Sequence, residues 1–331
     1  MAKKVLKNIL AAAIALPFCM CAFTACGEEE NFDIVNVYMP DGAPALALAG
    51  LMAGDTDADR LEYCVVNPIK IQSMVTGENA DVCILPLSAA TKFLGDGETY
   101  QMLGTVTHGN LYLISRADTT IYDAENLGGL IGKKVGVLQL ASTPGLAVKT
   151  ALTRCGVPFA ENGVAADKVN LVSMSGEADI ALLEEGGVEH FIMAEPEVTA
   201  LKRQGFSVIG NVQELYGENG YPQAVMVAKR ALIEEDEVFV RAFMQNVQTS
   251  VEWAKTASGA DIVAAVTAHL ENENYATKLD ATSLLRGVVA RCGVRFENAA
   301  ESKADVLEFL QAAGELNPNL ATLPQDGFFF E

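Results

Sequence analysis

Short apolar runs and longer segments with apolar residues at helical spacing alternate along the chain from Asp33 onward. The short runs are rich in β-branched residues, which is typical of strands, and the longer segments repeat their apolar positions as amphipathic helices do. Regular alternation of strand and helix is typical of βαβ units around mostly parallel sheets. The pattern therefore predicts an α/β fold.

The same pattern gives approximate limits for each element. Strands are predicted at residues 34–39, 62–66, 81–85, 100–107, 111–115, 134–138, 168–172, 190–193, 207–209 and 224–228. Helices are predicted at residues 43–52, 68–76, 88–94, 144–155, 177–184, 196–204, 234–254, 260–271, 280–290 and 302–313.

Two stretches of the chain resemble each other, which indicates two lobes of similar construction. The predicted strand at 34–37 leads through a short loop to Pro44, and the strand at 134–137 leads through a loop of the same length to Pro144. Each proline would lie in the first turn of a helix, where its missing N–H is not needed.

The chain is expected to pass twice between these lobes. We expect one lobe at residues 33–108 plus 223–331 and a second lobe at residues 109–222, joined by a two-segment hinge. The extended run 101–115 makes the first passage, and residues 218–223, which contain Gly and Pro, make the second. In open α/β sheets ligands bind outside the carboxyl ends of the strands, so two such lobes would share one cleft.

Composition and charge narrow the class of partner. The 331 residues are 50% hydrophobic, which is enough apolar material for a sizeable core spread over about two domains. Lys and Arg total 23 against 43 Asp and Glu, giving a net charge of -20. Because such a surface would repel a phosphate backbone, nucleic acid is excluded as an expected partner.

The N-terminal segment differs from the rest of the chain. Residues 1–25 carry three lysines and no acid, and their apolar run 9–16 ends at Pro17. This is typical of a secretory signal peptide, and the run is short for a spanning helix, although a retained signal anchor is the alternative. We assign 1–25 as a lipoprotein signal peptide and 26–32 as a polar tether.

The sequence offers little catalytic or metal-binding chemistry. It lacks a G-x-G-x-x-G, a G-x-S-x-G and an H-E-x-x-H motif, and its histidines are isolated. Cys64, Cys83, Cys155 and Cys292 are widely spaced without a C-x-x-C pair, so buried free thiols are favoured over disulfides for Cys64 and Cys83. No cofactor and no metal are predicted.

The loops that should line the cleft are rich in small and hydroxyl residues and contain no Lys or Arg. Backbone N–H groups at helix starts could hold a carboxylate or sulfonate there. Asp41 and Glu195 would instead add negative charge, which favours a cationic, amino-bearing or hydrogen-bond-donor ligand over nitrate or sulfate. A role for Asp41 as a turn or N-cap residue is an equal alternative to ligand contact.

Several segments resemble those of known exported proteins. The segment Phe23-Thr24-Ala25-Cys26-Gly27 resembles a bacterial lipobox, which implies cleavage before Cys26 and a lipid on its sulfur. Segments that resemble solute-binding lipoproteins of ABC importers, of the nitrate, sulfonate, taurine and thiamine-pyrimidine-precursor group, are Val-Tyr-Met-Pro-Asp-Gly-Ala-Pro-Ala-Leu-Ala (37–47), Gly-Lys-Lys-Val-Gly-Val-Leu (132–138), Ala-Glu-Pro-Glu-Val-Thr (194–199) and Gly-Tyr-Pro (220–222).

The resemblance covers about residues 33–309 and implies a type II periplasmic-binding-protein fold whose lobes close over one small ligand. It implies an ABC permease as partner, an extracytoplasmic location with a lipid anchor to the bacterial cell membrane, and a monomer. From the resemblance and the cleft loops together, the ligand-binding candidates are Met39, Asp41, Gly42, Ala43, Asn67, Ser88, His108, Gln139, Ser142, Thr143, Met174, Glu195 and Tyr221.

The expected function is capture of a small organic nutrient, either a heteroaromatic vitamin precursor or a sulfonate-like molecule, without catalysis. An enzyme on the same fold, such as a vitamin-precursor lyase or synthase, is one alternative, and a surface adhesion or scaffold lipoprotein is another. The enzyme would need an acid, base or nucleophile in the cleft, for which only Asp41, His108, Ser142 and Glu195 are candidates.

Overall fold

A computed structural model describes residues 32–54, 60–161, 163–217, 219–285, 287–316 and 322–331. Phe32–Glu331 form one compact unit. The predicted signal peptide, Cys26 and all of the tether but Phe32 lie outside the described residues. Among the helices of the described residues, none is both long and apolar enough to cross a membrane.

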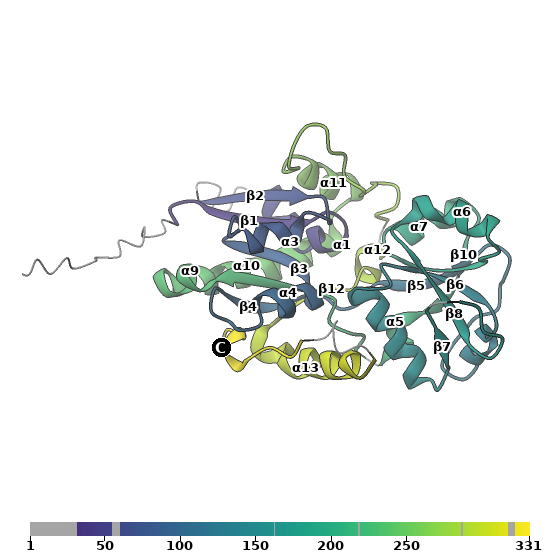
Figure 1. Cartoon of the computed structure of the whole chain (residues 1–331). Helices are drawn as coiled ribbons and strands as arrows, with labels where there is room; N and C mark the ends of the chain where they lie inside the picture. Colours follow the sequence, from purple (N-terminus) through teal and green to yellow (C-terminus); the bar gives the residue numbers. More distant parts are fainter. Residues whose placement is uncertain (1–31, 55–59, 162, 218, 286, 317–321) are drawn as a thin grey trace, which may run out of the picture. The chain divides into compact units, whose positions relative to one another are not determined.

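The first sheet combines strands from both ends of the chain (Figure 1). Its strands, in spatial order, are β12 (Val294–Asn298), β4 (Tyr100–Thr107), β11 (Ala224–Lys229), β3 (Val82–Pro86), β1 (Val35–Pro40) and β2 (Leu61–Val66). β1 runs parallel to β2 and β3, whereas β11 is antiparallel to both of its neighbours. The parallel part of the sheet is what the alternating pattern predicts.

The second sheet is built from one continuous stretch of chain. Its order is β10 (Ser207–Asn211), β5 (Leu111–Ser115), β9 (His190–Ala194), β6 (Lys134–Leu138), β8 (Val169–Met174) and β7 (Phe159–Ala160). β6 is parallel to β8 and β9, while β5 is antiparallel to β9 and β10. The two sheets with their helices form the expected α/β, periplasmic-binding-protein fold.

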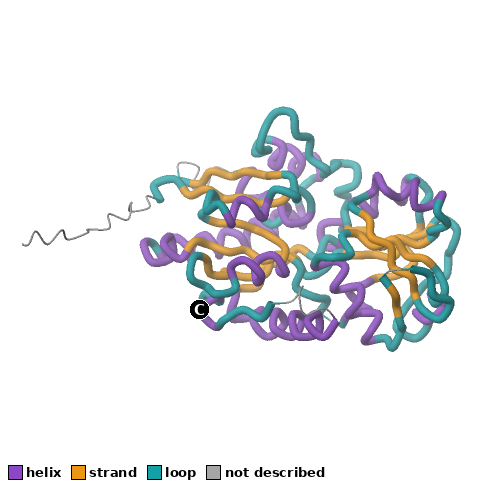
Figure 2. The backbone as a smooth tube through the Cα atoms, in the orientation of Figure 1, coloured by secondary structure: helices purple, strands orange, loops and turns teal. Residues whose placement is uncertain are grey.

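Helices and short 3-10 turns connect the strands and cover the sheets (Figure 2). The α-helices are α1 (Ala43–Leu46), α2 (Ala49–Ala53), α3 (Ile71–Thr76), α4 (Leu87–Leu94), α5 (Thr143–Arg154), α6 (Ile180–Glu185), α7 (Glu197–Arg203), α8 (Val212–Tyr216), α9 (Arg230–Glu235), α10 (Glu237–Thr256), α11 (Gly259–Thr267), α12 (Val288–Arg291) and α13 (Ala299–Leu316). The 3-10 helices are η1 (Leu127–Leu130), η2 (Glu177–Asp179) and η3 (Asp326–Phe328).

Helix α10 shows how the sequence pattern becomes structure. Asp236 caps its start, because its side chain accepts a hydrogen bond from the Phe239 backbone N–H at 2.9 Å. Val240, Phe243 and Val247 follow at helical spacing and are buried in the core shared with the first sheet. Figure 1 shows α10 running along this sheet, where it covers one face.

Apolar packing continues from one sheet to the other through α13. Tyr221 is 1% exposed and stacks on Phe309 of α13, with ring centroids 6.0 Å apart and planes at 20°. Tyr216, at the end of α8, also contacts Phe309, at a centroid distance of 5.9 Å. One hydrophobic core cluster therefore spans residues of both sheets.

Several predicted elements are wrong in part. Among the described residues of the predicted helix 280–290, only those from Val288 onward are helical, in α12, and the predicted helix 43–52 is divided into α1 and α2. The Asp280 side chain accepts hydrogen bonds from the Thr282 backbone N–H at 3.1 Å and the Ser283 hydroxyl at 2.8 Å. Such local bonds compete with helix formation. Figure 2 shows residues 268–285 as a long loop.

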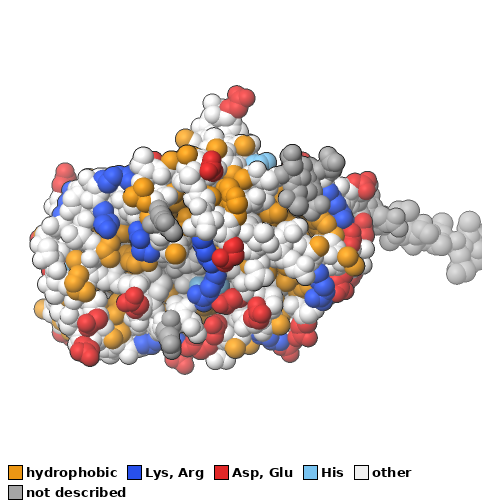
Figure 3. Space-filling model, turned by 180° about the vertical axis from the view of Figure 1, so that it is seen from behind, with side chains coloured by type: hydrophobic (Ala, Val, Ile, Leu, Met, Phe, Trp, Pro, Cys, Tyr) orange, Lys and Arg blue, Asp and Glu red, His pale blue; other side chains and the backbone are white. Residues whose placement is uncertain are grey.

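Acidic and basic side chains are both present on the face of the molecule that Figure 3 draws. On the face drawn in Figure 3, acidic side chains lie along the lower edge with basic side chains between them. Most of the ion pairs on the surface involve partly exposed groups, as in Arg241–Glu237 and Lys255–Glu252. Pairs of this kind contribute little stability, so the fold depends mainly on its apolar packing.

Candidate functional site

A cavity of about 270 Å³ lies between loops of the two sheets. Residues at the carboxyl ends of β1 and β3, from the first sheet, and of β6 and β9, from the second, line it. The starts of α1, α5 and α7 complete its walls. This is the place where α/β folds bind ligands, and the volume is close to the lower end of the range for small-molecule sites.

The structure brings about half of the predicted site residues together around this cavity. Those that line it are Asp41, Gly42, Ala43, Asn67, Gln139, Thr143 and Glu195. Gly42 precedes α1 with φ of 107°, a conformation that favours glycine, and Gln139 has φ of 48°. The loops after β1 and β6 therefore turn sharply to place these residues at the cavity.

Three apolar candidates lie in the core instead. Met39 is fully buried with the first sheet and α10, and Met174 is buried with the second sheet and α7. Tyr221 stacks on Phe309, as described above, and Gly109 lies against its ring. Strand-end methionines fit the apolar layers on both sheets, so their side chains are used for packing.

The hydroxyl candidates form links around the cavity. The Ser88 backbone N–H donates to the Thr143 hydroxyl at 3.2 Å, and this hydroxyl donates to the Ser88 hydroxyl at 2.9 Å. These bonds join α4, on the first sheet, to α5, on the second. Ser142 is partly buried, and its hydroxyl donates to the Gln139 backbone carbonyl at 3.0 Å. Of these hydroxyl residues, only Thr143 lines the cavity.

Asp41 anchors a loop of the C-terminal part of the chain. Its carboxylate, 5% exposed, accepts hydrogen bonds from the Thr277 hydroxyl and the Lys278 backbone N–H, each at 2.7 Å, and from the Tyr275 hydroxyl at 3.0 Å. Burial and this carboxylate both raise the pKa of Tyr275, which therefore stays protonated as a donor. The Asp41 carboxylate is therefore bonded to a distant loop of the protein, and not to the backbone of its own turn.

Glu195 is neutralised within the structure. It is 3% exposed, and its carboxylate accepts hydrogen bonds from the Thr199 backbone N–H and hydroxyl, each at 2.9 Å. The Arg291 guanidinium lies 3.0 Å away and also donates to the Thr199 hydroxyl at 3.2 Å. The negative charge that Glu195 brings to this loop is therefore paired with Arg291 within the protein.

His108 directly follows β4, at the passage between the two sheets, and does not line the cavity. Its Nε2 is 2.8 Å from the Glu297 carboxylate, and its backbone N–H donates to the Gly293 carbonyl at 2.9 Å. Burial lowers the pKa of His108, although the Glu297 carboxylate opposes the shift. The hydrogen bond from His108 lowers the pKa of Glu297 to about 2. His108 therefore ties the end of β4 to β12 and to the residue just before it.

Sequence reasoning missed Lys278, an exposed residue that lines the cavity. The loops predicted to line the cleft hold no Lys or Arg, and the loop anchored on Asp41, which was not among them, supplies Lys278. Burial raises the pKa of the neighbouring Glu197, and the charge of Lys278 lowers it. Sequence spacing gave no signal, because the contact joins segments more than two hundred residues apart.

Two amide side chains at the passages between the sheets were also missed. Asn110, between β4 and β5, and Gln223, just before β11, both line the cavity. Both positions belong to the loops that the sequence places at the hinge. Both loops were predicted to lie at the cleft, but their amide side chains were not among the predicted binding residues.

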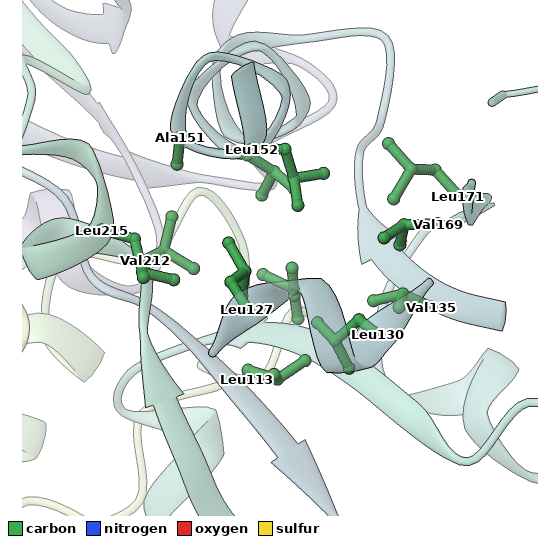
Figure 4. Close-up of a pocket in the computed structure, with 12 residues that line it drawn as sticks. Leu113, Leu127, Leu130, Val135, Ala151, Leu152, Val169, Leu171, Val212 and Leu215 are labelled. Atoms are coloured by element: carbon green, nitrogen blue, oxygen red, sulfur yellow. The ribbon is translucent and has the colours of Figure 1, made fainter. Parts of the chain in front are cut away.

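A second cavity lies inside the second sheet's core and does not fit a ligand. It measures about 20 Å³, and the side chains that line it are all aliphatic. Figure 4 shows Ala151 and Leu152 of α5 facing Leu127 of η1 and Val212 of α8 across it. A dry void of this size is a packing defect between helix and sheet rather than a binding site.

Among the described residues, no cluster of three or more His, Cys, Asp or Glu side chains could hold a metal ion. The cysteines Cys64, Cys83, Cys155 and Cys292 are free thiols. Burial raises the pKa of the Cys83 thiol above its ordinary range, so it stays protonated. The polar side chains that line the cavity are carboxylates, amides, hydroxyls and the Lys278 ammonium group.

Solved structures share this fold at low sequence identity. An ABC transporter from Parabacteroides distasonis is 19% identical with a TM-score of 0.69, and the match covers 90% of this chain and 99% of that one. The periplasmic aliphatic sulphonate binding protein SsuA from Escherichia coli is 13% identical with a TM-score of 0.65, covering 90% and 92%. The alkanesulfonate-binding protein SsuA from Xanthomonas axonopodis pv. citri, bound to MOPS, is 14% identical with a TM-score of 0.56, covering 88% and 95%.

Sequence comparison gives a family. No curated protein matches the sequence closely enough to be counted a relative. The family model described as NMT1/THI5 like matches residues 64–257, more than half of the chain. The chain therefore belongs to the NMT1/THI5-like family.

Proposed function

We propose that this protein is the extracytoplasmic ligand-binding component of an ABC importer, which captures a small organic nutrient and delivers it to a membrane permease. The observation that carries the proposal is the cavity between the two sheets, lined by the carboxyl ends of strands from both. The structures with the same fold include sulfonate-binding proteins and an ABC transporter protein, which supports the same class of function.

The lobes that close in this proposal are residues 33–108 plus 223–331 and residues 109–222. The passages at 108–110 and 221–223 would serve as the hinge. A ligand that contacts both lobes would favour the closed state, because closure is driven by differential affinity for that state. A monomer tethered through a lipid on Cys26 completes the proposed arrangement.

A binding role fits the cavity better than catalysis does. The acid-base candidates Asp41, Glu195 and His108 are each held by protein partners, with the distances given above. An enzyme needs an acid or base that can reach the substrate. Ser142, the one nucleophile candidate, is partly buried, and its hydroxyl bonds to Gln139 rather than to a base.

Thermal unfolding of the chain against a panel of nutrients tests the proposal. A panel of sulfonates, amino acids, nucleobases, thiamine precursors and flavins covers the expected class. A ligand at 100 times its Kd adds about 2.7 kcal/mol to the free energy of unfolding, so a true ligand raises Tm visibly. Small-angle scattering with the same ligand should show a smaller radius of gyration as the lobes close.

A folded protein that shows no Tm shift with any member of the panel would contradict the proposal and favour a scaffold role. Chemical change of a bound compound, followed by mass spectrometry, would instead favour an enzyme.

A further inference from the structure

Among the described residues that line the cavity between the two sheets, the charged ones are Asp41, Glu195, Glu197 and Lys278. Asp41 and Glu195 are occupied by protein donors, at the distances given above. Neither the Glu197 carboxylate nor the Lys278 ammonium group forms a hydrogen bond or an ion pair with a described residue. These two groups of opposite charge are therefore available to a ligand.

Glu197 is the first residue of α7, and the buried face of this helix holds it in place. Val198 and Leu201 are buried in the core of the second sheet. The Glu197 side chain is partly buried, and its carboxylate lies near enough to Asp41 and Lys278 for their charges to change its pKa. Because Asp41 and Lys278 line the cavity from the side of the first sheet, the Glu197 carboxylate lies on the cavity side of α7.

The backbone of Lys278 is fixed, whereas its side chain is exposed. Its N–H donates to the Asp41 carboxylate at 2.7 Å, and the next residue, Leu279, is buried in the core of the first sheet. The Lys278 side chain itself is exposed at the cavity. Its ammonium group can therefore bind a ligand without breaking a bond to the rest of the protein.

The charges around Glu197 favour a cationic group beside it. Burial raises the pKa of Glu197 most, the charge of Lys278 lowers it, and the charges of Glu177 and Asp41 raise it again. Burial and like charges both penalise an ionised carboxylate, and a nearby cation relieves this penalty. An amino group of a ligand would therefore bind at Glu197, whereas an acid group would be repelled there and would bind at Lys278.

Prolines provide much of the remaining wall of the cavity. Those that line it are Pro40, Pro44, Pro68, Pro86, Pro144 and Pro196. Proline rings offer apolar surface, and proline has no backbone N–H to donate. The part of a ligand that lies between its charged ends is therefore expected to be apolar.

We propose that Glu197 and Lys278 form a two-point site for a small zwitterion, in which Glu197 binds the amino group of the ligand and Lys278 binds its acid group. This inference rests on the proposed binding function, and it adds the ligand class and the residues that select it. Glu197 belongs to the proposed lobe at residues 109–222, and Lys278 belongs to the other lobe. A zwitterion bound at both residues would therefore hold the two lobes together.

Isothermal titration of the full chain with three matched sets of probes tests the site. Each set contains a zwitterion, an acid that lacks its amino group and an amine that lacks its acid group. The sets are β-alanine with propionate and propylamine, γ-aminobutyrate with butyrate and butylamine, and ε-aminocaproate with caproate and hexylamine, all at millimolar concentration. In the set whose length fits the cavity, the zwitterion should bind about tenfold more tightly than either other member, because each of those loses a charged hydrogen bond.

Single substitutions assign each end of the ligand to one residue. Glu197→Gln should abolish the preference for the zwitterion over the matched acid, and should keep the preference over the matched amine. Lys278→Gln should do the reverse. Thermal unfolding checks that both variants fold, as expected for side chains whose charged groups have no described protein partner. Glu185→Gln on α6 and Lys202→Gln on α7 are exposed controls outside the cavity lining, and should leave both preferences unchanged.

Three results would overturn the inference. The first is an acid or amine that binds as tightly as its zwitterion in every set. The second is a folded Glu197→Gln or Lys278→Gln variant that keeps both preferences or loses both. The third is the failure of all three zwitterions to bind at millimolar concentration.

The nutrient panel described above separates these results from a failure of the importer function. A panel member without an amino group that binds and closes the lobes would leave the importer function standing while the zwitterion site fails. A folded protein that binds neither the zwitterions nor any panel member would contradict both proposals.

Discussion

At the scale of single residues, the acidic side chains of the cavity hold the protein together. Asp41 and Glu195 are buried carboxylates whose oxygens are filled by donors from distant segments. A buried carboxylate is stable only with such partners. Removing either acid would therefore affect the fold before it affected a ligand.

Asp41→Asn should lower the free energy of unfolding by about 1–3 kcal/mol. An amide has only one acceptor oxygen, so it cannot accept all the hydrogen bonds that the two carboxylate oxygens accept from Thr277, Lys278 and Tyr275. Urea denaturation measures the change. Asp167→Asn, an exposed residue, is the control and should stay within about 0.5 kcal/mol of the parent. Equal effects of the two substitutions would contradict the anchoring role of Asp41.

His108 predicts how stability depends on pH. Its pKa is lowered in the folded state mainly by burial, so the unfolded chain takes up a proton first as the pH falls through about 6.5. Stability should therefore decrease from about pH 7.5 to pH 5. Glu297, with its pKa lowered to about 2, adds nothing in this window, because its contribution is lost only below its unfolded pKa of 4.5.

His108→Gln should flatten this pH dependence, measured as the urea midpoint at each pH. A matched His269→Gln variant shows whether loss of any histidine has the same effect. An unchanged slope in His108→Gln would show that other groups cause the pH dependence.

At the scale of elements, the buried stripe of α10 carries much of the packing against the first sheet. Val247 is fully buried, whereas Val238 on the same helix is 81% exposed. The two positions offer the same side chain in opposite environments. They therefore separate the effect of burial from that of helix propensity.

Val247→Ala should lower the free energy of unfolding by about 2 kcal/mol, through lost apolar contact and the cavity left behind. Val238→Ala should change it by less than about 0.5 kcal/mol, since the side chain is in water. Guanidinium denaturation of both variants gives the comparison. Similar losses at both positions would mean that α10 does not pack as the structure shows.

The sequence was informative about elements and less so about contacts. The alternating pattern predicts the strands of both sheets except β7 and β12, and the burial of α10 follows from its helical spacing. Residues 280–285 were mistaken for the start of a helix, because Asp280 forms side-chain bonds to its own segment that no apolar period reveals. The arrival of Lys278 at the cavity depends on the loop at 268–285, and so could not be foreseen.

At the scale of the whole molecule, several polar contacts join the two proposed lobes. Arg291 of α12 pairs with Glu195, next to α7, and Arg203 of α7 pairs with Asp280 at 2.8 Å. Arg154 of α5 also pairs with Glu308 of α13. These pairs must break or stretch if the lobes separate.

Arg291→Gln should therefore shift the ligand-free protein toward a more open state and lower its stability by roughly 1–3 kcal/mol, because Glu195 would remain buried without its cation. Small-angle scattering and urea denaturation measure the two effects. Arg241→Gln, which breaks an exposed pair with Glu237, should change stability by less than about 1 kcal/mol. A radius of gyration that is the same in Arg291→Gln and the parent would argue against this pair as a link between lobes.

The order of strands in the two sheets also fixes an order of assembly. All strands of the second sheet lie between Leu111 and Asn211, so this sheet can form as soon as that stretch has been synthesised. The first sheet places β11 and β12 on either side of β4, and must wait for residues up to Asn298. Contacts between residues so far apart in sequence form slowly. During synthesis β3 and β4 would therefore exist for a time with unpaired edges, because their partners β11 and β12 come later in the chain. This is the interval when a chaperone would protect this chain most.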